Sequence, residues 1–262
     1  MSQSPHVSVE KTDGVGRVVM DRPDRHNAMD PEMAEAIATN LELLADDDGV
    51  RCIVLTGSGH TFNTGADLSA LEGDESDESA IDEIAGPLHA SVRTMTTAPK
   101  PIVTGINGIV AGGGLGLALA SDVAIMSDSA RIEYAYPKIG LSGDGGITWL
   151  LPRLVGLRRA QAFALLGEPF EPSEAVERGL VTEAVPADGF DDRLATIAGE
   201  LATGPTRAYA TIRRLLFDGA DRSLDDHLVA ERDRLTGLTK TNDYATGVGT
   251  FFSDEEPEFA GR

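Results

Sequence analysis

The chain has 262 residues, of which 41% are hydrophobic and 25% charged, so it is long enough to bury a substantial core, and disorder of the whole chain is excluded. Its net charge of −21, from 43 acidic against 22 basic residues, opposes binding to nucleic acid or to anionic lipid. The near-apolar stretch 109–120 is too short and too rich in glycine to cross a bilayer, which takes roughly 18 apolar residues or more. We therefore expect no nucleic-acid partner and no membrane span.

The N-terminal residues, the cysteine content and the charge bear on the cellular compartment in which the protein works. Residues 1–10 lack the basic start and long apolar run of a signal peptide, so a cytoplasmic protein is expected. The single cysteine, Cys52, excludes an intrachain disulfide framework and lies in an apolar run typical of a buried strand. Few lysines and abundant aspartate suit a protein kept soluble in concentrated salt, where screening removes self-repulsion. A halophilic cytoplasm is one hypothesis, and an acidic protein of an ordinary cell is the other.

The first predicted elements in chain order are a strand and a helix. Residues 15–21 have the pattern of a strand. A helix is predicted after Asp30, a suitable N-cap, with Pro31 at its first position. Apolar residues follow at helical spacing and predict one inward-packed face: Met33, Ile37, Leu41 and Leu44.

Further strands are predicted at 51–56, 101–106 and 122–127, with a helix that begins at the glycine run between the last two. The acidic, serine-rich segment 72–83 is typical of a solvated loop or mobile lid. From about Asp188 onward strand patterns stop, and helical patterns follow at 208–217 and 224–238. The alternation of strands and helices predicts an α/β protein, which we divide into a core at 1–200 and a helical C-terminal segment at 201–262.

Two glycine-containing loops follow predicted strands, at 61–68 and at 107–116. The adjacent glycines 112–114 let another group approach the backbone closely, and the helix that follows directs unpaired N–H groups there. These features favour an anion or oxyanion site. A tight turn with close helix packing is the alternative.

Competing motifs are absent from the sequence. No glycine run fits G-x-G-x-x-G or G-x-x-x-x-G-K-[ST], which excludes these nucleotide-binding signatures. The segment 140–144 resembles a nucleophile elbow but ends in Asp144 where glycine is needed, so a serine hydrolase is not supported. The five histidines lack metal-site spacing, so we predict no metal and interpret each as an ordinary surface or packing residue: His6, His26, His60, His89 and His227.

Several segments together resemble, in family order, the crotonase (enoyl-CoA hydratase/isomerase) superfamily. They are Asp21-Arg22-Pro23, Asn27-Ala28-Met29, 62–68, 99–108, the glycine run, 140–141, 151–156 and 175–181. The resemblance implies a crotonase (ClpP-like) fold, a superhelix of repeated ββα units whose C-terminal helical segment drives trimerisation. It also implies an acyl-CoA thioester as substrate, no cofactor beyond the CoA of that substrate, and a homotrimer or a hexamer built from two trimers.

The resemblance further implies which residues form the site. The N–H groups of Ala66 and Gly113 would form an oxyanion hole for the thioester oxygen. CoA and the acyl group would lie along a larger set, contacted largely through backbone groups: Arg25, His26, Ala28, Thr64, Gly65, Asp67, Leu68, Gly112 and Tyr136.

Departures from the family pattern bear on the reaction. Hydratases of this family position water with two glutamates, and those places fall on Gly116 and Tyr136, neither of which serves as an acid or base at neutral pH. Asp144 stands where enoyl-CoA isomerases carry an aspartate, including the ring isomerase of phenylacetate degradation. The dehalogenase branch keeps an aspartate there as well, as a nucleophile. One carboxylate suffices to move a proton from C2 to C4, so we predict an isomerase with Asp144 as its acid and base.

Alternatives to these interpretations stay open. Asp144 could instead be a turn residue or the N-cap of the next helix. Tyr136 could line the acyl pocket or simply pack, Glu133 is expected on the other strand face, and Asp67 and Asp122 are expected to bind loop backbone groups. For the whole protein, the alternatives are a hydratase with an unusual water-activating group and a non-catalytic family member, for example one that binds RNA.

Overall fold

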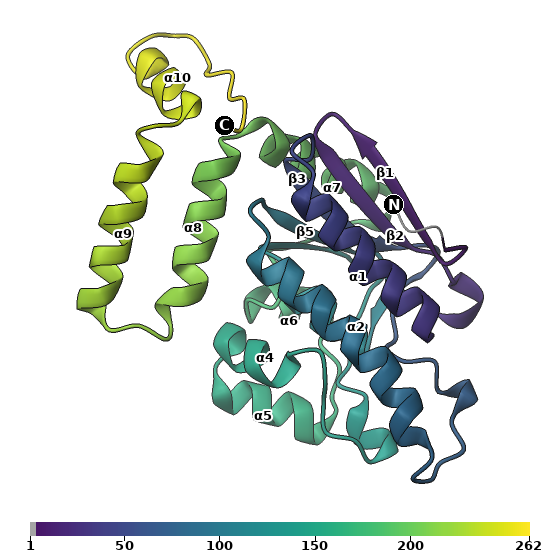
Figure 1. The fold of residues 1–262 in the computed structure, drawn as a ribbon. Helices are drawn as coiled ribbons and strands as arrows, with labels where there is room; N and C mark the ends of the chain where they lie inside the picture. Colours follow the sequence, from purple (N-terminus) through teal and green to yellow (C-terminus); the bar gives the residue numbers. More distant parts are fainter. Residues whose placement is uncertain (1–3) are drawn as a thin grey trace.

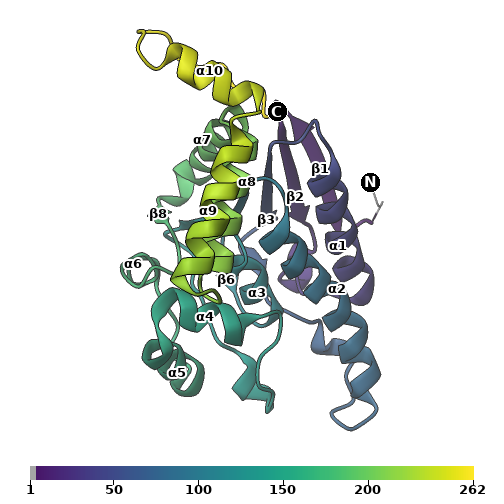
Figure 2. The same cartoon turned by 60° about the vertical axis from the view of Figure 1, so that its left-hand side comes forward.

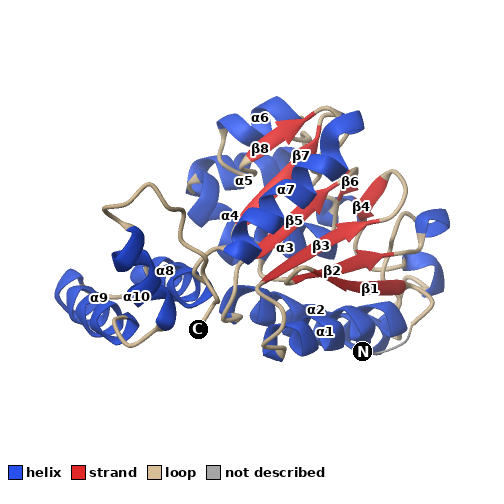
Figure 3. Ribbon diagram, turned by 90° about the horizontal axis from the view of Figure 1, so that it is seen from above, coloured by secondary structure: helices blue, strands red, loops and turns tan. Residues whose placement is uncertain are grey.

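Two sheets organise residues 4–262, the part of the chain described by this computed structural model (Figures 1 and 3). The main sheet has six strands in the order β1 (Val7–Thr12), β2 (Val15–Met20), β3 (Cys52–Gly57), β5 (Ile102–Ile106), β7 (Val123–Ser127) and β8 (Glu183–Val185). Only β1 runs antiparallel to its neighbour, while the other pairings in this sheet are parallel. A second, two-stranded parallel sheet joins β4 (Thr61–Asn63) to β6 (Ile109–Val110).

The central strands are apolar on both faces because helices cover both. Ile53 and Leu55 of β3 belong to the core that also holds the buried face of helix α1 (Pro31–Asp46). Cys52 and Val54 point the opposite way, into a smaller core with helix α7 (Phe190–Thr203). Cys52 is fully buried, which confirms that it is a core residue, and this burial raises the pKa of its thiol to about 12.

The predicted helix after Asp30 is confirmed. The Asp30 carboxylate accepts a hydrogen bond from the Met33 amide at 2.8 Å, and Pro31 occupies the first turn. All four apolar residues predicted to face inward are buried: Met33, Ile37, Leu41 and Leu44.

The four predicted strands are also confirmed, each within a residue or so, as β2, β3, β5 and β7. The prediction for 72–83 is wrong in its second half. Helix α2 runs over Asp77–Thr97, so only 72–76 precede it as a loop. The acidic residues Asp77 and Glu78 lie in the first helical turn, where negative charge stabilises a helix, and Ile84, Leu88 and Met95 bury its inner face.

The remaining helices complete the body and then leave it. The body adds α3 (Gly113–Leu119), α4 (Ile147–Val155), α5 (Leu157–Leu166) and α6 (Pro172–Glu177), with short 3-10 turns at Pro23–Arg25, Leu68–Ala70, Tyr136–Ile139 and Ala187–Gly189. Helices α8 (Thr206–Gly219), α9 (Leu224–Leu238) and α10 (Asn242–Thr250) then form an arm that projects from the body (Figures 1 and 2). None of the helices described in residues 4–262 is long and apolar enough to span a membrane.

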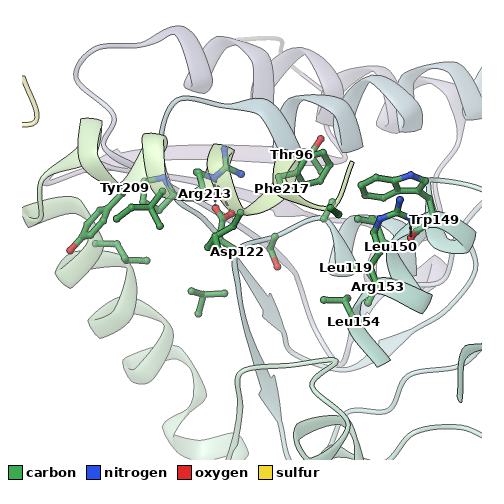
Figure 4. Close-up of a pocket in the computed structure, with 18 residues that line it drawn as sticks. Thr96, Leu119, Asp122, Trp149, Leu150, Arg153, Leu154, Tyr209, Arg213 and Phe217 are labelled. Carbon is green, nitrogen blue, oxygen red and sulfur yellow. Dashed lines mark hydrogen bonds and ion pairs between the residues drawn. The ribbon is translucent and has the colours of Figure 1, made fainter. Parts of the chain in front are cut away.

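Arg213 of α8 ties this arm to the body. Its Nε donates to both carboxylate oxygens of Asp122, at 2.9 and 2.8 Å, and its other nitrogens donate to the carbonyl oxygens of Ala98 and Met95. Asp122 also accepts the Ile102 amide at 2.8 Å, which confirms that it binds a backbone group. The pair borders a cavity of about 560 Å³ between α8 and the body, with Trp149 and Arg153 of α4 on its far side (Figure 4). This cavity is an apolar space between the arm and the body.

Candidate active site

Two loops meet at the carboxyl ends of β4 and β6 and touch through glycines. A Cβ placed on Gly65 would lie 2.8 Å from the Gly113 amide nitrogen, and one placed on Gly112 would lie 2.9 Å from the Thr64 carbonyl oxygen. Gly65 and Gly112 also have φ of +91° and +51°, which residues with a Cβ rarely adopt. Only glycine at these positions lets the two loops approach so closely.

Hydrogen bonds fix the first loop on both sides of Ala66. The Gly65 carbonyl accepts the Met29 amide at 2.7 Å, and the Asp67 amide donates to the Met29 carbonyl at 2.8 Å. Asp67 is held further by the Ser69 amide and by Arg22, at 3.1 and 3.0 Å. Asp67 therefore binds loop groups, as its neighbourhood in the sequence predicted.

Buried Asn63 links the two loops. Its side-chain oxygen accepts the Gly65 amide at 2.8 Å, its side-chain nitrogen donates to the Asn27 carbonyl at 2.6 Å, and its main-chain carbonyl accepts the Ala111 amide at 3.0 Å. Sequence reasoning placed Asn63 inside a motif but gave it no role.

The amides of Ala66 and Gly113 are left available by this arrangement. Within residues 4–262, neither N–H donates to a protein acceptor. The neighbouring amides of Gly65, Asp67 and Gly114 all do. Two backbone donors held by a rigid frame and aimed into a cavity form the usual oxyanion-binding arrangement.

Both amides border a cavity of about 420 Å³ whose walls are largely apolar. The far wall comes from α2, through Ile81, Ile84, Ala85 and Leu88. The other lining residues include Thr64, Leu68, Gly112, Tyr136, Leu141 and Asp144. An apolar cavity with two free amides and one carboxylate can hold an acyl group with its carbonyl oxygen on the amides.

Asp144 enters this cavity from a turn made almost wholly of glycine. Gly143, Gly145 and Gly146 have φ of +153°, +60° and +73°, so the turn excludes ordinary side chains at three of its positions. Helix α4 begins after Gly146 without a side-chain cap, so Asp144 is not the cap of this helix. Its carboxylate is 32% exposed and lies beside the Tyr136 side chain.

His89 of α2 contacts the Asp144 carboxylate, Nε2 against Oδ1. His89 is a half-exposed surface residue, as the sequence predicted, and its ring also meets the Asp144 carboxylate, a contact that the sequence did not predict. The two residues stand 55 positions apart, so no sequence spacing reveals the contact.

Tyr136 also contributes to the site. Burial, and then the nearby Asp144 charge, raise the pKa of the Tyr136 hydroxyl well above its usual value. Its phenol is therefore neutral at ordinary pH. Glu133, by contrast, accepts from Arg131 Nε at 2.6 Å and Lys138 Nζ at 2.8 Å, and it does not line the cavity.

Gly116 has no room for a side chain. A Cβ placed on it would lie 2.3 Å from the Gly145 carbonyl oxygen and 3.0 Å from the Gly145 carbonyl carbon. The position at which family hydratases carry a glutamate is therefore closed by backbone.

The residues predicted to contact CoA divide into two groups. Thr64, Leu68, Gly112 and Tyr136 line the cavity. Arg25, His26, Ala28, Gly65 and Asp67 do not, although the Thr64 hydroxyl joins the two stretches by donating to the His26 carbonyl at 3.2 Å. Arg25 and His26 are exposed on the 3-10 turn beside the cavity, and their contact with CoA stays a prediction.

Comparisons with known proteins agree with this architecture. The model of the enoyl-CoA hydratase/isomerase family matches residues 10–262. The 1,2-epoxyphenylacetyl-CoA isomerase of Escherichia coli (strain K12) is 36% identical over 261 residues, 97% of this chain and 97% of the relative. The 4-chlorobenzoyl coenzyme A dehalogenase-2 of an Arthrobacter species is 35% identical over 252 residues, 95% of this chain and 91% of the relative.

A solved structure extends the likeness to the whole fold. The crystal structure of enoyl-CoA hydratase from Bacillus anthracis matches with a TM-score of 0.92 at 27% identity, over 98% of this chain and 100% of that one. The relatives agree in family and differ in reaction. The chain belongs to the enoyl-CoA hydratase/isomerase family and is an enzyme of the crotonase superfamily.

Proposed function

We propose that this enzyme moves a double bond in an acyl-CoA, of the 3-enoyl to 2-enoyl type, with Asp144 as the single acid and base. Three features support the proposal: the free amides of Ala66 and Gly113, the apolar cavity beside them, and one carboxylate on the cavity wall. Within residues 4–262, no other Asp or Glu side chain lines that cavity.

The chemistry follows from these groups. The two amides bind the thioester oxygen and stabilise the negative charge that develops there when a proton leaves C2. Asp144 accepts that proton and gives a dienolate. Return of a proton from Asp144 to C4 completes the shift and restores the carboxylate.

The observation that carries the proposal is the contact between Gly116 and Gly145. Water addition in family hydratases uses a carboxylate at the place of Gly116, and here that place is filled by the Gly145 carbonyl. Tyr136, at the second hydratase position, holds its proton because burial raises its pKa. The site therefore lacks both of the carboxylates that a conventional hydratase mechanism uses.

The test is the reaction of the wild-type protein and Asp144→Asn with a 3-enoyl-CoA, and separately with the 2-enoyl isomer, followed by mass spectrometry in concentrated KCl and D₂O. We expect double-bond migration in the wild type and a loss of roughly 10²- to 10⁴-fold in the variant. Glu133→Gln, which removes a carboxylate outside the cavity, is the matched control and should keep the wild-type rate. Water addition that survives Asp144→Asn would instead establish the hydratase alternative.

A second reaction is favoured by one observation, the His89–Asp144 contact. A carboxylate nucleophile can displace the halide from the ring of a halobenzoyl-CoA and form an aryl ester, and an adjacent histidine base can activate water to hydrolyse that ester. Halide release from 4-chlorobenzoyl-CoA, with ¹⁸O from labelled water entering Asp144, would support this reaction. The absence of halide release, with migration intact, would exclude it.

We also infer how the enzyme assembles and where it works. CoA lies over residues 25–28 and 64–68, and the helical C-terminal segment at 201–262, which includes the arm, joins copies into a homotrimer or a dimer of trimers. Exposed apolar side chains on the arm support this assembly: Leu216, Leu224, Leu235, Phe251 and Phe252. The net charge of −21 supports a cytoplasm rich in salt. Light scattering at graded salt concentrations tests the assembly and its dependence on salt.

A further inference from the structure

The carboxylate on the cavity wall is one half of a pair. His89 Nε2 contacts Asp144 Oδ1, and the histidine comes from α2, which also supplies part of the cavity wall. Its neighbour Leu88 packs between those loops and the Asp144 turn, because its Cδ2 would lie 2.8 Å from a Cβ on Gly113 and 3.2 Å from one on Gly145. The position of His89 is thus fixed by a buried anchor on the same helix.

The two members of the pair differ in their access to water. Asp144 belongs to the cavity lining, and 32% of its side chain is exposed. His89 does not line the cavity, and 49% of its side chain is exposed. The pair therefore extends from the acyl pocket to the protein surface.

We propose that His89 orients the Asp144 carboxylate and relays the proton that Asp144 carries to and from bulk water. This inference rests on the proposed function, since it requires that Asp144 takes a proton from C2. Histidine suits the task because its ring has two nitrogens, so that one can face the carboxylate while the other faces water.

The proton balance of the relay closes. In the resting pair the neutral His89 ring donates its Nε2–H to the Asp144 carboxylate. After Asp144 has accepted the C2 proton and become a carboxylic acid, water takes the proton from Nε2 and supplies one to Nδ1, and the carboxylic acid then passes its proton to the vacated Nε2. The resulting imidazolium exchanges its N–H protons with water. One proton then returns to Asp144 and is delivered to C4, so that carboxylate and neutral imidazole are restored.

The other polar side chains near Asp144 do not serve as a relay. The Tyr136 hydroxyl keeps its proton, because burial raises its pKa. Tyr134 donates its hydroxyl proton to the Ser142 carbonyl at 2.6 Å, and Lys138 is bound to Glu133 at 2.8 Å. His89 is the group whose geometry connects Asp144 to the surface.

The experiment measures how much solvent deuterium enters the product at C4 per double-bond shift, at low conversion of a 3-enoyl-CoA in D₂O. Three variants are compared with the wild type. His89→Gln keeps a hydrogen-bond donor but cannot carry the extra proton, and His89→Leu lacks both abilities. His60→Gln makes the same exchange of side chains at an exposed residue outside the cavity lining.

We expect the ratio of deuterium incorporation to turnover to fall roughly tenfold or more in both His89 variants and to stay unchanged in His60→Gln. The rate itself should fall by roughly tenfold or more in His89→Leu, in which the carboxylate loses a hydrogen bond, and by less in His89→Gln. A merely structural role would lower the rate without changing the ratio.

Other outcomes overturn the relay. If His89→Gln incorporates deuterium in the wild-type ratio, or if the wild type shifts the double bond with no solvent deuterium at all, the relay is wrong while the isomerase stands. If the wild type neither shifts the bond nor exchanges protons, the proposed function fails and the relay fails with it.

Discussion

Substitution of Gly116 by alanine tests the contact that separates the isomerase from the hydratase. The new Cβ would lie 2.3 Å from the Gly145 carbonyl oxygen. Ordinary carbon–oxygen contacts begin at about 3.3 Å, so α3 and the Asp144 turn must separate by about 1 Å. Because the partner is backbone and not the end of a flexible side chain, we expect an overpacking cost of about 1–3 kcal/mol.

Gly199→Ala is the matched control for this substitution. Gly199 lies inside α7, and a Cβ on it would meet no atom within 4 Å. Alanine stabilises a helix interior by about 1 kcal/mol relative to glycine in both variants. The difference between the free energies of unfolding of the two variants therefore isolates the cost of the contact.

The assays are denaturant unfolding in concentrated KCl and the rate of the double-bond shift. Gly116→Ala should be less stable than Gly199→Ala by about 1–3 kcal/mol. It should also lose up to about 10²-fold in rate, since a displacement near 1 Å misplaces the adjacent Asp144 carboxylate. Equal stability of the two variants, with full activity in Gly116→Ala, would refute the argument that this position is closed.

Three further results are expected. Hydrogen bonds from Ser69, and also Arg22, hold the pKa of Asp67 below its ordinary 3.8, so the stability that Asp67 contributes is complete above about pH 4 and is lost as the pH falls through the lowered value. The difference in unfolding free energy between the wild type and Asp67→Asn should accordingly shrink on acidification, and a constant difference would contradict it. Arg213→Met should cost about 1–3 kcal/mol by leaving the Asp122 carboxylate unpaired, and Asp122→Asn added to it should recover part of that loss. Finally, the midpoint of thermal unfolding should rise between about 0.1 and 1 M KCl, over which the Debye length falls from about 10 to 3 Å and screens the repulsion among the acidic residues. A midpoint that does not change with salt would count against the halophilic hypothesis.

Of the four strands that the sequence predicted correctly, β3, β5 and β7 are buried on both faces, whereas β2 alternates between buried and half-buried residues. Residues 52–55 form a continuous apolar run, and residues 102–106 are all buried, because α1 lies on one side of the sheet and α7 on the other. The strands missed are short or lie at an edge: β4 and β6 have three and two residues, and β8 has three.

β1 was missed although its signal was present. The alternating Val7–Thr12 strand leads into Asp13-Gly14, a dipeptide typical of tight hairpins. Both residues have positive φ, 49° and 79°, as such a turn requires. The Asp13-Gly14 turn therefore indicates the antiparallel edge of the sheet from sequence.

The site was predictable in its residues and not in its contacts. The order of motifs pointed to Ala66, Gly113 and Asp144, all of which line one cavity. Local pattern could not show that α2 continues to Asp77 at its start and carries His89 over the turn at Gly143–Gly146, because that contact depends on how α2 packs across α3 and α4. The helical face of α2 is readable from sequence, whereas its angle to the body is a property of the fold.

The absence of a side chain at position 116 and the turn that carries Asp144 are one structural change. An aspartate at 144 reaches the cavity because the glycines around it allow a tight left-handed turn, and this turn puts the Gly145 carbonyl against Gly116. A side chain on α3 at position 116 and this turn compete for the same space. Gly116→Glu alone should therefore disrupt the turn and lower the isomerase rate without creating water addition to a 2-enoyl-CoA. Efficient hydration by the single variant would show that the space is not shared and that the two positions vary independently.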